Sequence, residues 1–146
     1  VDLAFKNGTD GNIVEYPVIV DTGSSNLAIA VAACTSCDSG STSLRLGWYD
    51  PELCIDVTYG SGSWDGLMTA KTQVGFIDGD ETWMDDVYLG GIITSDSFFE
   101  GNFNGILGLA YSALSESYST CTTSLMEKEM DVSLTKIQHG IQKKNA

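Results

Sequence analysis

The stretch that most constrains this chain is the octet at residues 18–25, Val-Ile-Val-Asp-Thr-Gly-Ser-Ser. Three β-branched residues follow Pro17 and precede a polar turn that contains glycine, a pattern that predicts a short strand buried on both faces. Asp21 comes where this strand leaves the core, so we expect a partly desolvated carboxylate surrounded by hydroxyl and backbone N–H groups. Such surroundings tune carboxylates for proton transfer. The simpler alternative is an Asp that opens a turn by accepting a hydrogen bond from its own backbone.

The length and charge of the chain narrow its class. A chain of 146 residues suits one domain, and 16 glycines with only two prolines are typical of a turn-rich β protein. No apolar run approaches the roughly 20 residues that span a bilayer, so we expect no membrane span. The formal net charge of −13 argues against nucleic acid and anionic membranes as partners. The negative charge is compatible with a protein of an acidic compartment, but an acidic surface alone would also explain it.

The cysteines point to an oxidising environment. Cys34, Cys37, Cys54 and Cys121 allow two disulfides in three connectivities. Asn7 begins a glycosylation sequon, which has meaning only in a secreted protein. The Cys34–Cys37 spacing also occurs in redox and zinc sites, but no second pair completes a zinc site and no βαβ pattern is present. We therefore predict a disulfide that closes a loop, a secreted or lumenal location, and neither metal nor cofactor.

Alternating apolar residues and turn formers divide most of the chain into short strands. Residues 1–5 and 13–20 are predicted to form a hairpin, and residues 27–31 a further strand. Later strands are expected at residues 74–77 and 82–93. Ile106 and Leu107 then predict a buried strand followed by Gly108, a residue that lets another backbone approach closely.

A second hairpin is the other informative stretch. Residues 55–59 and 64–72 are expected to be its arms, with Gly60-Ser61-Gly62 at the tip. Tyr59 lies on one arm and Trp64 on the other. A glycine-rich hairpin of this kind can form a mobile cover over a cleft, and an ordinary solvent-exposed hairpin is the alternative.

The tail of the chain has a helical pattern. Met126, Met130, Leu134, Ile137 and Ile141 recur at steps of four, four, three and four. We therefore predict a carboxyl-terminal helix, with a short strand at residues 132–134 as the weaker alternative.

Three stretches together resemble one family. Asp-Thr-Gly-Ser-Ser-Asn at 21–26, Tyr-Gly-Ser-Gly-Ser at 59–63 and Phe-Asn-Gly-Ile-Leu-Gly-Leu-Ala-Tyr at 103–111 are similar, in order and spacing, to the amino-terminal lobe of pepsin-like aspartic proteases. The resemblance extends over roughly residues 1–130. Asn-Leu-Ala-Ile from Asn26 and Ser-Asp-Ser-Phe-Phe from Ser95 are most similar to the β-secretase type.

The resemblance implies a fold and a set of roles. It implies a mostly β chain, a single pepsin-like lobe over residues 1–146 that is half of a bilobal acid-protease fold, with a flap hairpin and a carboxyl-terminal helix. Asp21 would be the catalytic carboxylate. Thr22 would lock two active-site loops together, Ser24 would bond the outer carboxylate oxygen, and Gly23 completes the loop.

The resemblance also assigns the flap and one pocket wall. Tyr59, Gly60 and Ser61 would form the flap over a peptide or protein substrate. Most relatives carry a Trp where this chain has Ala28, hydrogen-bonded to the flap Tyr. We predict that Trp64 donates this bond to the Tyr59 hydroxyl instead. The resemblance further implies that Phe98 or Phe99 lines a substrate pocket.

The chain departs from the family in one decisive respect. The chemistry takes two carboxylates about 3 Å apart, and this chain contains one Asp-Thr-Gly. The preferred hypothesis is a homodimer in which each copy contributes Asp21 across a two-fold axis. The alternatives are the amino-terminal half of a two-lobed protease that needs a separate carboxyl-terminal lobe, and an inactive lobe that binds peptides or proteins. The basic, helix-like tail favours a natural end over a truncated chain.

Overall fold

The computed structural model describes residues 1–6, 11–37, 53–68, 72–77, 82–99 and 101–120. The elements in these ranges are β1 (Asp2–Lys6), β2 (Ile13–Asp21), β3 (Leu27–Ala30), β4 (Leu53–Tyr59), β5 (Gly62–Met68), β6 (Thr72–Phe76), β7 (Thr82–Val87), β8 (Gly90–Asp96), β9 (Gly105–Gly108), the 3₁₀ helix η2 (Ser112–Leu114) and β10 (Ser119–Thr120). The strands form one sheet in the order β10-β4-β5-β8-β3-β9-β2-β1-β6-β7. The predicted fold class, mostly β and consistent with a single pepsin-like lobe, is confirmed.

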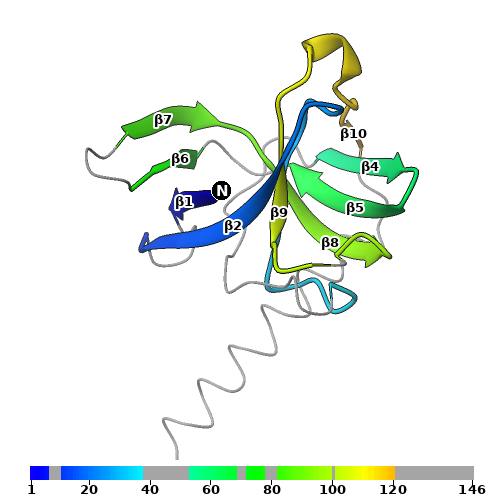
Figure 1. Cartoon of the computed structure of the whole chain (residues 1–146), viewed down its shortest axis with the longest axis horizontal. Coiled ribbons are helices and arrows are strands. Elements are labelled where there is room, and N and C mark those ends of the chain that lie inside the picture. Colours follow the sequence, from blue (N-terminus) through cyan, green and yellow to red (C-terminus); the bar gives the residue numbers. More distant parts are fainter. Residues whose placement is uncertain (7–10, 38–52, 69–71, 78–81, 100, 121–146) are drawn as a thin grey trace, which may run out of the picture.

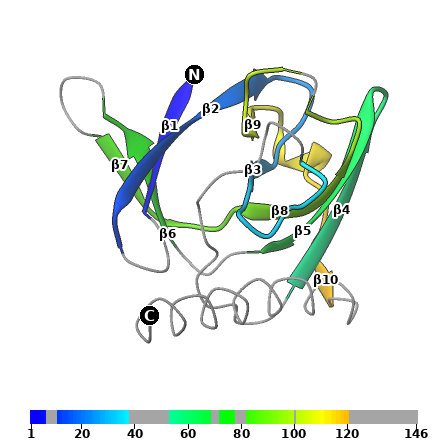
Figure 2. The same cartoon turned by 90° about the horizontal axis from the view of Figure 1, so that it is seen from below.

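The sheet has two halves that meet along the parallel pair of β2 and β9. Strands β1, β6 and β7 lie on one side of this pair, and β4, β5 and β8 lie on the other (Figure 1). Seen from below, the two halves curve around a shared interior (Figure 2). Two strand pairs, β2–β9 and β3–β8, are parallel, whereas the other pairs are antiparallel. Strand β9 therefore brings a late segment of the chain beside the end of β2.

Both predicted hairpins are present. Strands β1 and β2 pair antiparallel from Asp2 opposite Pro17 to Lys6 opposite Ile13. Strands β4 and β5 pair up to Tyr59 opposite Gly62, which leaves Gly60 and Ser61 at the tip. The second arm also pairs with β8 along its length, so the hairpin is joined to the body of the sheet.

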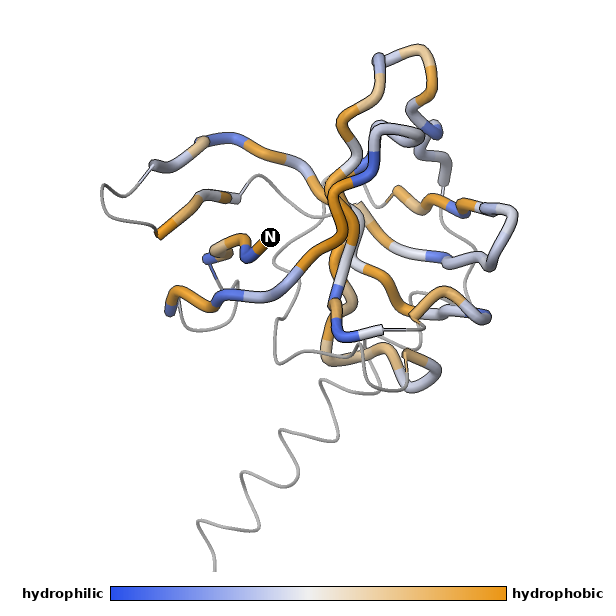
Figure 3. Tube along the Cα trace, viewed as in Figure 1, coloured by the Kyte–Doolittle hydropathy of each residue, from blue (hydrophilic) through white to orange (hydrophobic). Residues whose placement is uncertain are grey.

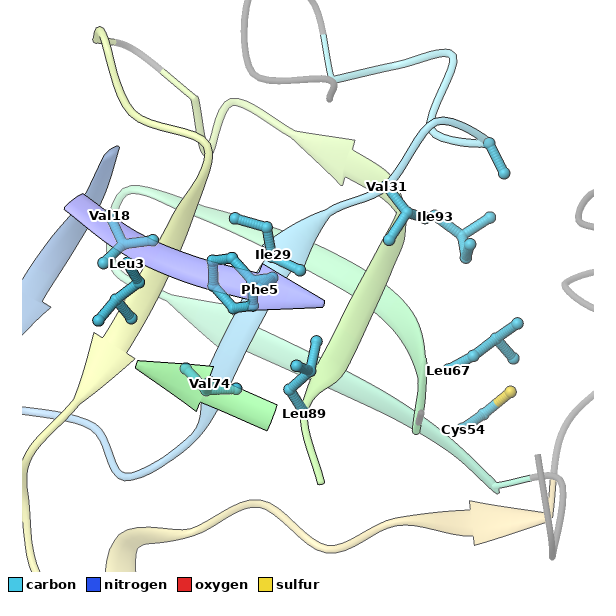
Figure 4. Packing of buried hydrophobic residues seen from close by; sticks show 11 residues of the cluster. Leu3, Phe5, Val18, Ile29, Val31, Cys54, Leu67, Val74, Leu89 and Ile93 are labelled. Carbon is cyan, nitrogen blue, oxygen red and sulfur yellow. The ribbon is translucent and has the colours of Figure 1, made fainter. Parts of the chain in front are cut away.

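Two clusters of buried side chains form the core. Figure 4 shows the first, which joins both halves of the sheet and contains Leu3, Phe5, Val18, Ile29, Val31, Ala33, Cys54, Leu67, Val74, Leu89 and Ile93. The second surrounds Trp64 and contains Ala28, Ala30, Cys34, Cys37, Ile55, Val57, Ile92 and Ile106. Burying one large apolar side chain contributes about 1.5–3 kcal/mol, so these clusters hold the two halves of the sheet together.

The octet does not form a strand buried on both faces, and that prediction is wrong. Val18 is 3% exposed, but Ile19 is 41% and Val20 is 50% exposed. The end of β2 extends past the core, so only its first apolar residue is covered. Hydrophobic residues nevertheless continue along the end of β2 and along β9 in the middle of the molecule (Figure 3).

The cysteine prediction is confirmed where the structure describes it. Cys34 and Cys37 form a disulfide, and Cys54 is also disulfide-bonded. The predicted helix in the tail and the sequon at Asn7 lie outside the described residues. Among the described residues, no helix has the length and apolar character needed to cross a membrane.

Candidate active site

Asp21 lies at the last position of β2, paired with Gly108 of β9. A turn begins at Thr22, and the Gly23 N–H donates a 2.9 Å hydrogen bond to Asp21 Oδ1. The carboxylate is therefore held by the turn that it opens, as the simpler alternative predicted. It also remains half-buried at the edge of the core, whereas Thr22 and Gly23 are exposed.

Gly108 lets β9 pack directly against the Asp21 loop. A Cβ atom at this position would lie 2.6 Å from the Asn26 nitrogen and 2.7 Å from the Ser24 carbonyl oxygen. Real Cβ atoms do not approach backbone atoms that closely. The predicted close approach at Gly108 is confirmed, and the backbone that approaches is the loop that carries the carboxylate.

A pocket of about 340 Å³ opens beside the carboxylate. Its walls come from the end of β2, the tip of the β4–β5 hairpin, the segment after β8, and the segment from Phe103 into β9. The lining residues are Ile19, Asp21, Tyr59, Ser61, Ser97, Phe98, Phe103 and Ile106. The fold therefore brings together two regions that the sequence analysis singled out, the Asp21 loop and the hairpin.

Aromatic rings form one side of this pocket. Phe98 stacks on Tyr59 with ring centroids 5.4 Å apart. Phe98 also contacts Phe99 edge-on at 4.9 Å and Phe103 edge-on at 6.0 Å. Of the two expected candidates, Phe98 lines the pocket and Phe99 packs beside it. Aromatic pairs of this geometry contribute about 0.5–1.5 kcal/mol beyond area burial, so these contacts stabilise an apolar wall.

Sequence reasoning missed Ile19, Ser97, Phe103 and Ile106 as lining residues. Ile19 carried a usable signal, because it precedes Asp21 by two positions and so projects from the same face of the strand. Ile106 pairs with Ile19 across the parallel β2–β9 ladder. Ser97 and Phe103 lie in stretches that carried the family resemblance, but nothing in those stretches predicted that these two residues line the pocket. They reach it through the path of the chain after β8.

Three buried polar atoms come from the β4–β5 hairpin and the Asp21 loop: the Tyr59 hydroxyl, Trp64 Nε1 and Ser24 Oγ. None of them forms a hydrogen bond of standard geometry within the described residues. The implied Ser24–Asp21 bond is therefore not seen among the described residues. Burial raises the pKa of Tyr59, and the charges of Asp21 and Glu116 add to the rise. Hydrogen bonding from the Trp64 and Ser24 side chains opposes this increase. Both side chains therefore lie close to the Tyr59 hydroxyl, as the predicted Trp64–Tyr59 bond requires, with a geometry outside the standard limits.

The position of Trp64 explains why small residues surround it. A Cβ atom at Gly90 would lie 3.2 Å from Trp64 Cη2 and 3.3 Å from the Ala28 Cβ. The indole thus lies over the face of the sheet where Ala28 of β3 is paired with Gly90 of β8. A larger side chain at Ala28 would compete with the Trp64 ring.

Comparisons of the sequence with known proteins point to one protein family. A family model described as eukaryotic aspartyl protease matches residues 8–137. The chain belongs to this family.

Three curated family relatives show how far the similarity extends. Major aspartyl peptidase 1 of Cryptococcus neoformans var. grubii is 30% identical over 115 residues. Chymosin of Callithrix jacchus is 32% identical over 112 residues, and pepsin II-1 of Oryctolagus cuniculus 32% over 120. These alignments cover 73%, 72% and 73% of this aspartyl protease chain, but only 22%, 28% and 28% of the relatives. The chain therefore spans less than a third of the length of these relatives.

Proposed function

We propose that this chain supplies one catalytic carboxylate, Asp21, to an aspartic endopeptidase that hydrolyses peptide bonds. The observation that carries the proposal is the position of Asp21 on the wall of a pocket that also contains Tyr59, Ser61 and Phe98. Membership in the aspartyl protease family supports it. A peptide with a large apolar side chain is the substrate that an aromatic wall of this kind fits best.

The chemistry follows from a pair of carboxylates that share one proton. Like charges about 3 Å apart cannot both ionise, so one group keeps a proton while the other is charged. The charged carboxylate takes a proton from water as the water oxygen attacks the peptide carbonyl carbon, and the protonated one hydrogen-bonds the carbonyl oxygen. The Gly23 N–H holds one oxygen of Asp21, which restricts rotation of the carboxylate. Thr22 is assigned to joining the two active-site loops, and Ser24 to bonding the outer oxygen once a second lobe is in place.

The second carboxylate is assigned to Asp21 of a second copy of the chain. Val20 is 50% and Leu109 is 56% exposed, and the Leu109 N–H donates to the Asp21 carbonyl over 2.7 Å. Exposed apolar side chains beside a catalytic group are typical of a contact surface. A two-fold axis through this surface places both copies of Asp21 at the axis. A separate carboxyl-terminal lobe would cover the same surface, and an inactive binding lobe would leave it free.

The type of flap and the location of the protein are assigned from further observations. A β-secretase type of flap is supported by Trp64, whose indole lies against Ala28 and Gly90. A secreted or acidic lumenal location is supported by the Cys34–Cys37 disulfide and by the net charge of −13. Residues 1–146 are assigned to one lobe.

Sedimentation combined with a peptide-cleavage assay near pH 4 tests the proposal. A homodimer has a mass near twice 15.6 kDa, and its activity falls more steeply than linearly on dilution. Asp21→Asn abolishes cleavage and leaves the folded state intact, whereas the exposed Asp2→Asn serves as a matched control with unchanged activity. Cleavage that persists in Asp21→Asn contradicts the assignment of Asp21. An active, strictly monomeric chain contradicts the homodimer, and an inert one shifts the assignment to a separate lobe or a binding function.

A further inference from the structure

A strap formed by residues 109–116 lies against the loop that carries Asp21. The Leu109 N–H donates to the Asp21 carbonyl over 2.7 Å, and the Ala110 N–H donates to the Ser24 carbonyl over 2.8 Å. Farther along, Ser25 Oγ donates to the strap carbonyl of Tyr111 over 2.5 Å. The first half of the strap is thus bonded to the loop at three points.

Asn26 holds the other end of the strap. Its side chain is only 6% exposed, so its amide must find partners within the protein. Its Oδ1 accepts a 2.9 Å hydrogen bond from the Glu116 N–H, and its Nδ2 donates to the Glu116 carbonyl over 3.3 Å. The Ser115 hydroxyl accepts a third bond from Nδ2 over 3.4 Å. Because an unpaired buried polar group costs about 1–3 kcal/mol, Asn26 and the strap end fix one another.

The held end of the strap is close enough to the pocket to affect it. Burial is the main cause of the raised pKa of Tyr59, and the negative charge of Glu116 contributes to the same increase. Asn26 binds the backbone of Glu116 on both its N–H and its carbonyl. Movement of this end of the strap would therefore change the electrostatic environment of the flap as well as the contacts of the loop.

We infer that Asn26 is a positioning residue for Asp21. By clamping the strap at Glu116 it keeps the strap amides on the carbonyls of Asp21 and Ser24, and these bonds set the direction in which the Asp21 carboxylate leaves β2. The inference rests on the proposed function for its catalytic consequence, since Asn26 itself touches neither the pocket nor the reacting atoms.

Asn26→Ala tests the inference with two measurements that do not need activity and one that does. Amide hydrogen exchange at Leu109, Ala110 and Glu116 is expected to accelerate at least about tenfold, the change that corresponds to losing roughly one hydrogen bond. The carbon-13 shift of the Asp21 carboxyl is expected to move. Because small displacements of a reacting group cost up to about a hundredfold, kcat is expected to fall about 10- to 100-fold with KM little changed. Asn26→Asp retains the acceptor for the Glu116 N–H and is expected to restore part of each effect.

Two further variants complete the test. Ser25→Ala removes only the bond to Tyr111 and gives a folded protein with a weaker form of the same changes, should Asn26→Ala not fold. Gln73→Ala is the matched control, because it removes another side-chain amide bond, 2.6 Å to Asp85 on the β6–β7 pair, and leaves the strap unchanged.

The measurements separate failure of the inference from failure of the proposed function. An Asp21 carboxyl shift that stays unchanged while the strap amides exchange faster overturns the inference, and so does unchanged strap exchange in a folded Asn26→Ala. A parent chain that does not cleave peptides, combined with a moved Asp21 shift, contradicts the homodimer in the proposed function and supports the positioning role of Asn26.

Discussion

Gly108→Ala is the substitution whose effect the structure defines most sharply. The new Cβ would lie 2.6 Å from the Asn26 nitrogen, 2.7 Å from the Ser24 carbonyl oxygen and 2.8 Å from the Asn26 carbonyl oxygen. Ordinary van der Waals contact begins at 3.4 Å, so the closest pair must separate by about 0.8 Å, the difference between 3.4 and 2.6. All three atoms belong to the backbone and cannot move aside as a side-chain end would.

The expected cost follows from that displacement. Overpacking of a well-packed region destabilises a protein by about 1–3 kcal/mol. For a chain of this size we expect Tm to fall by about 3–10 °C. The displaced segment is the loop that carries Asp21, so peptide cleavage should fall even at temperatures where the variant is fully folded, by as much as about a hundredfold.

Thermal unfolding and cleavage kinetics, measured in parallel on Gly108→Ala and Gly60→Ala, test this reasoning. A Cβ at Gly60 would meet no atom within 4 Å, so this matched glycine substitution should leave Tm unchanged. An unchanged Tm for Gly108→Ala would refute the reasoning, because it would mean that β9 and the Asp21 loop are not in the close contact described above.

Two further predictions concern the protonation of a half-buried tyrosine and the pocket wall. Burial raises the pKa of Tyr118 to about 12, whereas an unfolded tyrosine titrates near 10. The folded state therefore retains the proton in this range, and stability falls as pH rises from about 10 to 12, by up to about 3 kcal/mol. Tyr118→Phe should flatten this slope in urea unfolding, and an equal slope would contradict the burial of the hydroxyl. Phe98→Ala removes the ring that stacks on Tyr59 and should raise KM for a peptide with a large apolar side chain at least about tenfold. The control is Phe76→Ala, which changes a β6 residue that is 38% exposed. A rise in KM no larger than that of the control would exclude Phe98 from substrate binding.

Features set by neighbouring residues could be predicted from the sequence. The β1–β2 hairpin and the Gly60–Ser61 tip follow from alternation and turn residues, which act over a few positions. The Cys34–Cys37 disulfide needed only a short spacing, and Gly108 was a glycine behind a buried strand. The position of Asp21 at the end of β2 was predicted for the same reason.

Features that depend on distant contacts could not be predicted. The octet has the composition of a fully buried strand, yet Val20 is exposed because β2 outruns the core that covers Val18. Phe103 and Ser97 line the pocket only because the chain after β8 turns back toward the flap. The Trp64–Tyr59 bond was predicted from the order of residues on a hairpin, but the two groups meet without standard bond geometry.

The sequence by itself indicated the family and one candidate carboxylate: one Asp-Thr-Gly, a glycine-tipped hairpin and a third matching stretch all resemble the same family. These signals are local, because propensity and spacing act within a few residues. Only the tertiary structure decided what surrounds that carboxylate, namely the aromatic wall, the β9 contact through Gly108 and the Asn26 clamp on the strap. Each of these pairs residues far apart in the chain, and such pairing depends on strand register and packing, which no single segment encodes.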